Sequence, residues 1–539
     1  ACVDWLDAAI GISAEGKRAF APILGTGGNE GRLDYTNSFM EYLSQLLISP
    51  GQKAPVGSLL ENALFGTATA GFQPSAVGQY DPGRAGGFNQ GQGVEAADVP
   101  SNPWNFVLTL EGAVAWASGL YRRQGVRYKP FLCSPFTVRS TAVGYGSSTG
   151  KDGALSRAEV WAPLWSRPSR YAEVKALLRE GRASLDAKPA RNGLEFAQAA
   201  CMLGVDRGID GFVRYNLLKR RGDSYIALPS GRFEVTERPE TALVRELAPI
   251  LEETDAQLRT PPAGYESLRR QVDEAIYTLL LSGGPQALED LASSMGRLTR
   301  WILGTAKAVR FYKRLSEKWL NSLWHLPEAR IASAVAGIWH PDVGAFRNHI
   351  DRNAREFAWT GADLPERMTR ALERRILLAE SLGVKHNALT SAVYAGAGDA
   401  VSFLEGTLDD ELIEDLVFAF TLLDWRRAGQ RRAENENEVG VWPISALLKH
   451  LFLSSALATP AGDVFVTGDL AVTSALRANR IDEAAQTATR RLLNAGLLPI
   501  EAEFEAGFDG MRLAASLLIP VRYGAALRSP VLRSAATGA

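Results

Sequence analysis

The order of apolar and polar residues divides the chain into a strand-containing first part and a helical second part. In residues 1–240, apolar runs at 135–145, 159–165, 225–228 and 232–236 are bounded by turn formers and predict strands, with a turn at 229–231 (Pro-Ser-Gly). Two helices are also predicted here, at 194–204 and at 102–121, where Asn102 as N-cap and Pro103 at the first position favour a helix start.

From Thr241 onward, apolar residues recur at helical spacing almost throughout. The predicted helices are 241–259, 265–281, 285–320, 327–339, 343–359, 365–382, 391–404, 408–425, 442–456 and 481–495. Glycine is concentrated in the first part, which holds 30 of the 51 glycines. We therefore predict an α+β protein, with a glycine-rich mixed α/β N-terminal region followed by a mostly α-helical C-terminal region. The expected domains are 1–240 (mixed α/β and contacting nucleic acid), 241–425 (helical) and 426–539 (a C-terminal helical-bundle portion).

Composition excludes several classes of protein. With 46% hydrophobic and 22% charged residues, the chain is globular rather than disordered or fibrous. The net charge of −1 excludes a generally basic coat for nucleic acid, although a local basic groove remains compatible with it. Arginine makes up 47 of the 59 basic residues, which suits phosphate and base contacts but also follows from a GC-rich genome.

The cysteine positions and the hydropathy of the chain indicate its cellular compartment and whether it spans a membrane. Cys2, Cys133 and Cys201 are far apart and form no C-x-x-C, which argues against a disulfide scaffold or a cysteine zinc site and fits a reducing cytosol. The sequence has no run of 18 uncharged apolar residues, and the best candidate, 107–121, contains Glu111. We therefore expect a cytoplasmic protein that does not enter a membrane.

Two glycine-rich segments resemble nucleotide loops but miss the required spacing. The segment 25–31 (GTGGNEG) has Glu30 where a dinucleotide loop needs glycine, and 144–152 (GYGSSTGKD) has Tyr145 and Asp152 where a phosphate loop needs glycine and Ser or Thr. We predict no cofactor and no catalytic residue.

The histidines allow one enzymatic alternative. His340, Asp342, His349 and Asp351 lie close together in the sequence and are compatible with a metal-dependent nuclease or nucleotide hydrolase. The adjacent His-Asp pair that a metal phosphohydrolase needs is absent, so a capping or surface role is the favoured interpretation and no metal site is predicted.

Two loops combine glycine with amide and arginine side chains, at 25–35 (GTGGNEGRLDY) and 78–93 (GQYDPGRAGGFNQGQG). Glycine lets the backbone approach a ligand closely, while amides can pair with adenine and arginine with guanine. The alternative is a plain surface loop rich in turn formers. The predicted DNA-binding residues are Asn29, Arg32, Arg84, Asn89 and Gln90.

A second candidate lies in the predicted helix 285–320. At 100° per residue, six basic residues of 296–320 fall within an arc of about 140° beside an apolar arc. This arc is either a solvated face or a surface that follows a nucleic-acid backbone. The predicted backbone contacts are Arg297, Arg300, Lys307, Arg310, Arg314 and Lys318.

Six segments of the first part together resemble one family. The segments are 24–40 (LGTGGNEGRLDYTNSFM), 76–91 (AVGQYDPGRAGGFNQG), 102–113 (NPWNFVLTLEGA), 135–147 (PFTVRSTAVGYGS), 159–168 (EVWAPLWSRP) and 204–215 (GVDRGIDGFVRY). In this order, from about Trp5 to Val235, they resemble the large-subunit family of type I-G (formerly I-U) CRISPR effector complexes. Family members usually carry a further region ahead of the segment that begins at Trp5, and its contacts are not assigned to residues of this chain.

The resemblance implies a non-catalytic subunit of Cascade, the CRISPR RNA-guided surveillance complex. Its implied partners are CRISPR RNA, target double-stranded DNA, the backbone and handle-binding Cascade subunits, and the helicase-nuclease effector. It would recognise the protospacer-adjacent motif in duplex DNA, support R-loop formation and help to recruit the helicase-nuclease. Since guide pairing reads the target, such a protein needs only a few contacts to a short motif and to the backbone. The alternatives are the enzyme described above and a scaffold that contacts only proteins.

Overall fold

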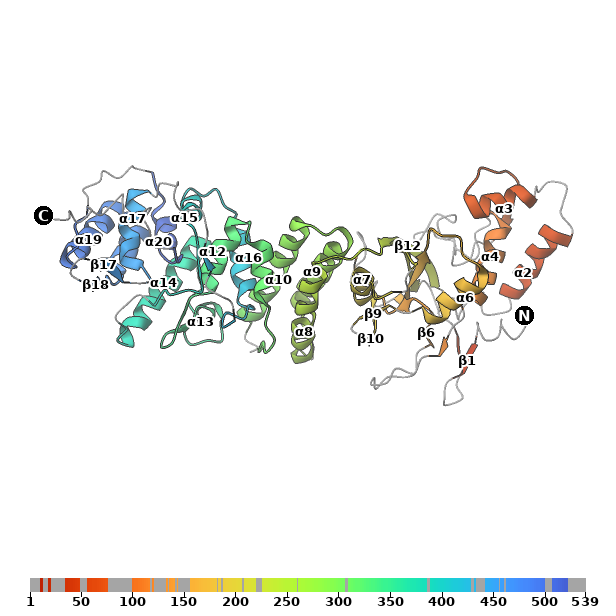
Figure 1. Ribbon diagram of the computed structural model, residues 1–539, viewed down its shortest axis with the longest axis horizontal. Helices are drawn as coiled ribbons and strands as arrows, with labels where there is room; N and C mark the ends of the chain where they lie inside the picture. Colours follow the sequence, from red (N-terminus) through yellow and green to blue (C-terminus); the bar gives the residue numbers. More distant parts are fainter. Residues whose placement is uncertain are drawn as a thin grey trace. The chain divides into compact units, whose positions relative to one another are not determined.

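The structure is a computed structural model (Figure 1). It describes residues 10–12, 18–20, 34–48, 56–75, 99–116, 119–120, 132–133, 135–140, 143, 156–181, 183–185, 188–205, 208–219, 225–258, 260–305, 309–384, 388–427, 431–432, 442–454, 456–459, 462–499 and 507–521. Helices dominate and the strands are mostly antiparallel, so the predicted mixed α+β class is confirmed. The chain forms two compact units, residues 1–241 with 276–282, and residues 242–275 with 283–539.

The first unit contains a four-stranded antiparallel sheet in the order β12-β11-β8-β7. Its strands are β7 (Thr137–Val138), β8 (Ser156–Leu164), β11 (Gly211–Lys219) and β12 (Tyr225–Glu234). The turn predicted at 229–231 is wrong. Strand β12 continues through it, and the register shifts because Tyr215 pairs with Pro229 whereas Arg214 pairs with Gly231. Ser230 is therefore the extra residue of a β-bulge, beside Gly231 at φ 129°.

Aromatic side chains fill one face of this sheet. Phe196 of α7 (Gly193–Cys201) stacks on Trp161 of β8, with ring centroids 4.3 Å apart, and contacts Phe212 of β11 at 5.0 Å. The same face holds a fully buried ion pair, in which Arg214 Nε donates to Glu159 Oε1 at 2.9 Å. The opposite face is packed by Ala158, Val160, Leu217 and Ala227.

A small helical cluster in this unit includes the helix start predicted at Asn102. Helix α4 (Pro103–Ala115) packs with α2 (Asp34–Leu43), η3 (Ser44–Ile48) and α3 (Val56–Phe65) around Tyr42, Leu46, Leu59 and Val107. Asn102 accepts a hydrogen bond from the Trp104 amide at 3.1 Å and donates to the Leu59 carbonyl at 2.7 Å. The predicted cap is confirmed, and the same side chain also anchors α3.

The remaining elements of the first unit are short strands and one further helix. They are β1 (Ile10–Ile12), β2 (Arg18–Phe20), β3 (Gln73–Ser75), β4 (Val99–Ser101), β5 (Gly119–Leu120), β6 (Leu132–Cys133), α6 (Tyr171–Glu180), β9 (Ser184–Leu185) and β10 (Lys188–Pro189). The strands pair antiparallel as β1-β2, β3-β4, β5-β6 and β9-β10.

The second unit is built mainly from helices. Its first elements are α8 (Thr241–Gln257), α9 (Ala263–Ser282, whose last seven residues belong to the first unit), α10 (Pro285–Gly304), α11 (Glu317–Leu323), α12 (Pro327–Ala336), β13 (Trp339–His340), β14 (Gly344–Ala345), α13 (Arg347–Ile350) and α14 (Leu364–Ser381). They are followed by β15 (Val393–Tyr394), α15 (Ala397–Leu404), α16 (Asp410–Phe420), β16 (Arg431–Arg432), α17 (Pro443–Lys449), η4 (His450–Phe452), β17 (Leu457–Thr459), β18 (Gly462–Val464), α18 (Leu470–Arg477), α19 (Ile481–Asn494) and α20 (Gly510–Ser516).

Helix α16 passes very close to α10. A Cβ added at Gly296 of α10 would lie only 1.9 Å from the Asp415 carbonyl oxygen of α16. Helix α16 begins at the N-cap Asp409, which accepts hydrogen bonds from the Glu411 and Leu412 amides at 2.9 and 3.1 Å. The carboxylates Glu414 and Asp415 are thereby placed beside the α10 surface on which basic residues were predicted.

Several predicted helices of this unit are wrong in extent. Helix α10 ends at Gly304 instead of continuing to 320, and the predicted helix 343–359 is helical only over α13. In the second case the carbonyl of His349 accepts hydrogen bonds from the Ala358 and Trp359 amides at 2.8 and 3.0 Å, which folds the chain back on itself. The predicted helix 391–404 begins only at Ala397, after strand β15. No helix among the described residues is long and apolar enough to cross a membrane.

Candidate nucleic-acid interface

The loop residues predicted to bind DNA lie outside the described residues. They are Asn29, Arg32, Arg84, Asn89 and Gln90, and Lys307 of the predicted basic arc lies outside them as well. The candidate interface is therefore built from the other basic residues of that arc.

The end of α10 at Gly304 removes the continuous helical face on which the arc was predicted. Arg297 and Arg300 lie on α10, Arg310 and Arg314 on the segment 309–316, and Lys318 in the first turn of α11. The arc is wrong as a single surface, because one helical rotation no longer relates these residues. They fall into two groups with different surroundings.

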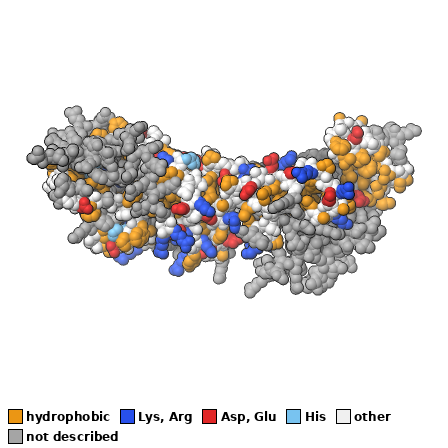
Figure 2. Space-filling view, viewed as in Figure 1, with side chains coloured by type: hydrophobic (Ala, Val, Ile, Leu, Met, Phe, Trp, Pro, Cys, Tyr) orange, Lys and Arg blue, Asp and Glu red, His pale blue; other side chains and the backbone are white. Residues whose placement is uncertain are grey.

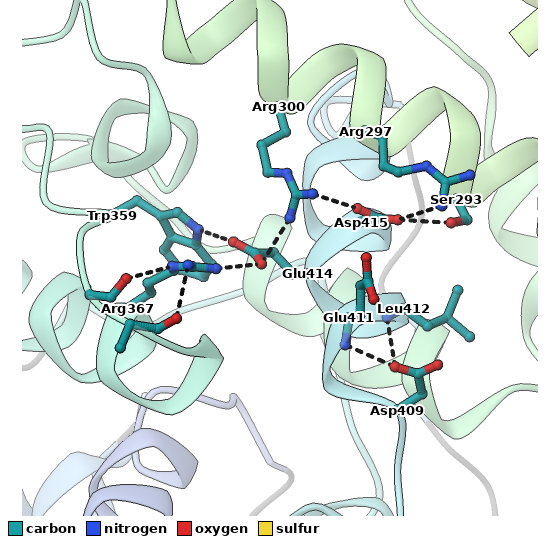
Figure 3. Close-up of polar contacts among 12 residues, drawn as sticks. Ser293, Arg297, Arg300, Trp359, Arg367, Asp409, Glu411, Leu412, Glu414 and Asp415 are labelled. Atoms are coloured by element: carbon teal, nitrogen blue, oxygen red, sulfur yellow. Dashed lines mark hydrogen bonds and ion pairs between the residues drawn. The ribbon is translucent and has the colours of Figure 1, made fainter. Parts of the chain in front are cut away.

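Arg297 and Arg300 belong to an ion-pair network with α16 (Figure 3). Arg300 Nη1 donates to Glu414 Oε2 at 2.9 Å, and its Nη2 lies 3.7 Å from Asp415 Oδ1. Arg297 Nη1 lies 3.8 Å from Asp415 Oδ2, which accepts a hydrogen bond from Ser293 at 2.8 Å. Both arginine side chains are 36% exposed, whereas both carboxylates are nearly buried.

The network extends to α14 and to Trp359. Arg367 Nη1 donates to Glu414 Oε2 at 2.6 Å, and Trp359 Nε1 donates to Glu414 Oε1 at 2.8 Å. Burial raises the pKa of Asp415 to about 6, although Ser293, Arg300 and Arg297 act in the opposite direction. Arg297 and Arg300 therefore join α10 to the nearly buried carboxylates of α16, and Arg367 joins α14 to one of the same carboxylates. The sequence predicts these two arginines as nucleic-acid backbone contacts and gives no sign of their carboxylate partners, Glu414 and Asp415.

The second group lies on an extended segment held by side chains of α8. Gln257 accepts from the Arg310 amide at 3.0 Å and donates to the Arg310 carbonyl at 2.7 Å. Glu253 accepts from the Tyr312 and Lys313 amides at 3.1 and 3.3 Å, and Glu246 accepts from the Ser316 amide at 3.0 Å. The backbone donors that a helix would satisfy internally are satisfied here by side chains of α8, which stabilises the non-helical form of this segment.

The other side of this segment is held by the chain that follows α16. The Leu315 amide donates to the Leu422 carbonyl at 2.9 Å, and the Asp424 amide donates to the Leu315 carbonyl at 2.9 Å. Val309, Phe311 and Leu315 are buried. The segment is thus held by its backbone hydrogen bonds and by these three buried side chains. Most of the residues between the buried ones are exposed.

The outward side chains are mostly basic. Arg310, Lys313, Arg314 and Lys318 are exposed, and Tyr312 is 69% exposed. Arg314 Nη1 donates to the Thr421 carbonyl at 3.2 Å, which uses one of its five donors. Sequence reasoning found Arg310, Arg314 and Lys318 but missed Lys313 and Tyr312, because on a helical wheel these two fall away from the basic arc.

Further positive charge lies next to this segment. The Arg347 guanidinium lies 5.1 Å from the centroid of the Phe311 ring. Burial lowers the pKa of Arg347, and the positive charge of Arg314 lowers it further. Burial likewise lowers the pKa of Arg314, with Asp424 opposing and Arg426 adding to the effect. On the face shown in Figure 2, Lys and Arg side chains gather along the lower edge of the second unit. An anion at this surface would relieve repulsion among these arginines.

The histidine segment has a different geometry from that of a hydrolytic site. His349 is fully buried, with Nδ1 3.1 Å from the Glu356 carbonyl and Nε2 3.2 Å from Arg375 Nη1. Since a guanidinium can only donate, Nε2 is the acceptor and Nδ1 carries the proton. Burial, together with Arg375, lowers the pKa of His349 to about 4. His340 Nδ1 accepts from the Asp342 amide at 3.2 Å. In the part of the chain that the structure describes, no three His, Cys, Asp or Glu side chains are grouped so that they could hold a metal ion.

Comparison with known proteins adds no family. No protein-family model matches the chain, and no curated protein matches its sequence.

Proposed function

We propose that this chain is the large subunit of a type I CRISPR RNA-guided surveillance complex, in the cytoplasm, and that it binds nucleic acid without catalysing a reaction. In this role it recognises the protospacer-adjacent motif in duplex DNA, supports R-loop formation and helps to recruit the helicase-nuclease. The observation that carries the proposal is the ordered resemblance of six segments between Trp5 and Val235 to one family of such subunits.

The second unit supports a nucleic-acid role on independent grounds. The segment 309–316 and the start of α11 present Arg310, Lys313, Arg314 and Lys318 to solvent from a backbone that is already fixed. A rigid row of cations suits a polyanion, because little conformational entropy is lost when the complex forms. The net charge of −1 means that this attraction is local and does not come from the molecule as a whole.

The alternative of a metal-dependent nuclease or nucleotide hydrolase gains nothing from the described geometry. It would use the segment from His340 to Asp351. Both ring nitrogens of His349 contact other protein groups, Nδ1 the Glu356 carbonyl and Nε2 the Arg375 guanidinium. Asp351 accepts a hydrogen bond from the Asn353 amide at 3.0 Å, as in a turn.

The test is assembly of the complex. The chain is co-expressed with CRISPR RNA and the other complex subunits, and the purified assembly is titrated with duplex targets that carry or lack the protospacer-adjacent motif. We expect the chain to co-purify in the assembly and the assembly to prefer the motif-bearing duplex. Asn89→Ala and Gln90→Ala should reduce that preference by about 1–3 kcal/mol if either amide pairs with a base.

A turnover assay separates the proposal from the enzymatic alternative. The purified chain is incubated with ATP or labelled DNA in the presence of Mg²⁺ or Mn²⁺, beside His340→Ala and Asp342→Ala variants. Turnover that either substitution abolishes would refute the non-catalytic proposal. If the chain joins the assembly, but assemblies with and without it have the same motif preference and the same DNA affinity, the chain would instead be a protein-binding scaffold.

A further inference from the structure

We propose that Tyr312 is a base-stacking platform, and that with the flanking basic side chains it forms a binding site for single-stranded nucleic acid. The inference deepens the proposed function, on which it rests for the biological source of the strand. The juxtaposition that carries it is an exposed aromatic side chain set among cations on a backbone that α8 holds by hydrogen bonds.

Tyr312 is much more exposed to solvent than the aromatic residue that precedes it. The ring is 69% exposed, whereas the neighbouring Phe311 is only 7% exposed. The Tyr312 amide is fixed by Glu253 at 3.1 Å, so the ring projects from an anchored backbone. A tyrosine side chain has only two rotatable bonds, and holding its backbone fixed lowers the cost of ordering it on a ligand.

The surroundings of the ring favour a polyanion as the ligand. Arg310 and Arg314 lie two residues to either side, and Lys313 follows directly, all of them exposed. The carboxylates of Glu246 and Glu253 accept hydrogen bonds from backbone amides of the segment, and Asp424 partly offsets the charge of Arg314. The outward charge is therefore positive on both sides of the ring. Tyrosine and arginine are also enriched in protein interfaces, so a protein partner is the competing occupant that the experiment has to separate.

The combination of ring and cations favours an unpaired strand over a duplex. In a duplex each base is already stacked between its neighbours, so an external ring gains little from contact with it. A single strand exposes the faces of its bases, and stacking on an aromatic side chain is worth about as much for any base. The phosphates of the same strand would meet Arg310, Lys313 and Arg314. The site should thus bind single strands with little sequence preference.

The two kinds of contact respond differently to salt. Loss of a phosphate contact reduces the salt dependence of binding, with the slope of log K against log salt falling by about 0.7 for each contact to a single strand. Loss of the stacking contact weakens binding by the same factor at every salt concentration, because no counterion is released. Tyr312→Ala and Arg314→Gln can be told apart on this basis alone.

The experiment uses the full chain and fluorescently labelled oligonucleotides. Binding of a 20-nucleotide oligo-dT, an oligo-U of the same length and a random-sequence duplex is measured by anisotropy over a salt series. We expect Tyr312→Ala to weaken single-strand binding about 5- to 150-fold with an unchanged salt slope. Tyr312→Phe should restore it, since the ring is kept, and duplex binding should change less than twofold. The strand bound more tightly, DNA or RNA, identifies the natural source.

A matched control is Trp339→Ala, because Trp339 is also an exposed aromatic of the second unit, at 56% exposure, but is followed by His340, Pro341 and Asp342 and has no arginine or lysine within two residues. It should leave binding unchanged. Circular dichroism of Tyr312→Ala should match that of the unchanged chain, since the ring is exposed.

Three outcomes overturn the inference: no binding of either single strand, less than a twofold effect of Tyr312→Ala, or an equal effect on the duplex. Reduced assembly with the other subunits, without a change in oligonucleotide binding, would make Tyr312 a protein contact. A chain that binds single strands through Tyr312 but does not join a CRISPR complex would refute the proposed function and leave the site standing.

Discussion

Arg300 tests whether the basic residues of α10 stabilise the fold or bind nucleic acid. Its Nη1 donates to Glu414 at 2.9 Å, and its side chain is 36% exposed. A hydrogen bond between charged groups contributes about 1.5–3 kcal/mol when buried, and partial exposure reduces this by screening. Glu414 keeps Arg367 and Trp359, so Arg300→Gln does not leave an isolated buried charge. We therefore expect Arg300→Gln to lower the free energy of unfolding by about 1–2 kcal/mol.

Two other substitutions provide larger and smaller effects on stability for comparison with Arg300→Gln. Arg367→Gln removes a shorter bond to Glu414, at 2.6 Å, together with hydrogen bonds to the carbonyls of Gly361 and Ala362 at 3.2 Å each. It should cost more, about 2–3 kcal/mol. Arg310→Gln replaces an exposed side chain and should change stability by less than about 0.5 kcal/mol. Arg310→Gln should therefore be the most stable of the three variants, Arg300→Gln intermediate and Arg367→Gln the least stable.

The assay measures stability and binding on the same proteins. Denaturant unfolding is followed by tryptophan fluorescence, and single-strand binding is measured across a salt series. Arg310→Gln should lower the salt slope by about 0.7 without a change in stability, and Arg300→Gln should do the reverse. An Arg300→Gln protein with an unchanged unfolding midpoint and a reduced salt slope would refute this division between structural and binding arginines.

Three further predictions concern packing and buried charge. Gly296→Ala should lower the free energy of unfolding by about 1–3 kcal/mol, because the added Cβ would lie 1.9 Å from the Asp415 carbonyl oxygen. Gly304→Ala, which adds a Cβ in open space, is the control, and thermal melting measures both. Arg214→Met should cost about 3–5 kcal/mol because it leaves Glu159 buried without this partner, and the double variant Glu159→Leu/Arg214→Met should recover most of that loss in the same unfolding assay. In the unfolded chain His349 takes up a proton near pH 6.5, but in the fold only near pH 4, so its contribution of about 3 kcal/mol is lost as the pH falls between these values. Asp415, whose pKa is raised to about 6, has the opposite sign and partly cancels this loss, so Asp415→Asn should make acid unfolding steeper below pH 6, and an unchanged pH profile would contradict the assignment.

Local signals in the sequence predicted much of the fold. Asn102 with Pro103, Pro285 and Pro327 each begin a helix where the sequence predicts one, since capping and the fixed φ of proline depend only on neighbouring residues. The bulge at Ser230 was mistaken for a turn because Pro-Ser-Gly favours both, and only pairing with β11 distinguishes them.

The end of α10 shows why the candidate site was harder to predict than the helices. Val309, Tyr312 and Leu315 are spaced three residues apart and fit the apolar face of a helix, so the pattern of the chain alone continues the helix to 320. In the structure the amides of Arg310, Tyr312 and Ser316 instead donate hydrogen bonds to Gln257, Glu253 and Glu246, which lie 53 to 70 residues earlier in the chain. Their spacing on α8, at 246, 253 and 257, places the three acceptors on one helical face, along which an extended strand can lie. The same contacts turn Tyr312 outward and separate Arg310 and Arg314 from Arg297 and Arg300. A helix would have placed all four arginines on one surface. In the fold, Arg297 and Arg300 instead pair with the buried carboxylates of α16, whereas Arg310 and Arg314 lie on an exposed segment.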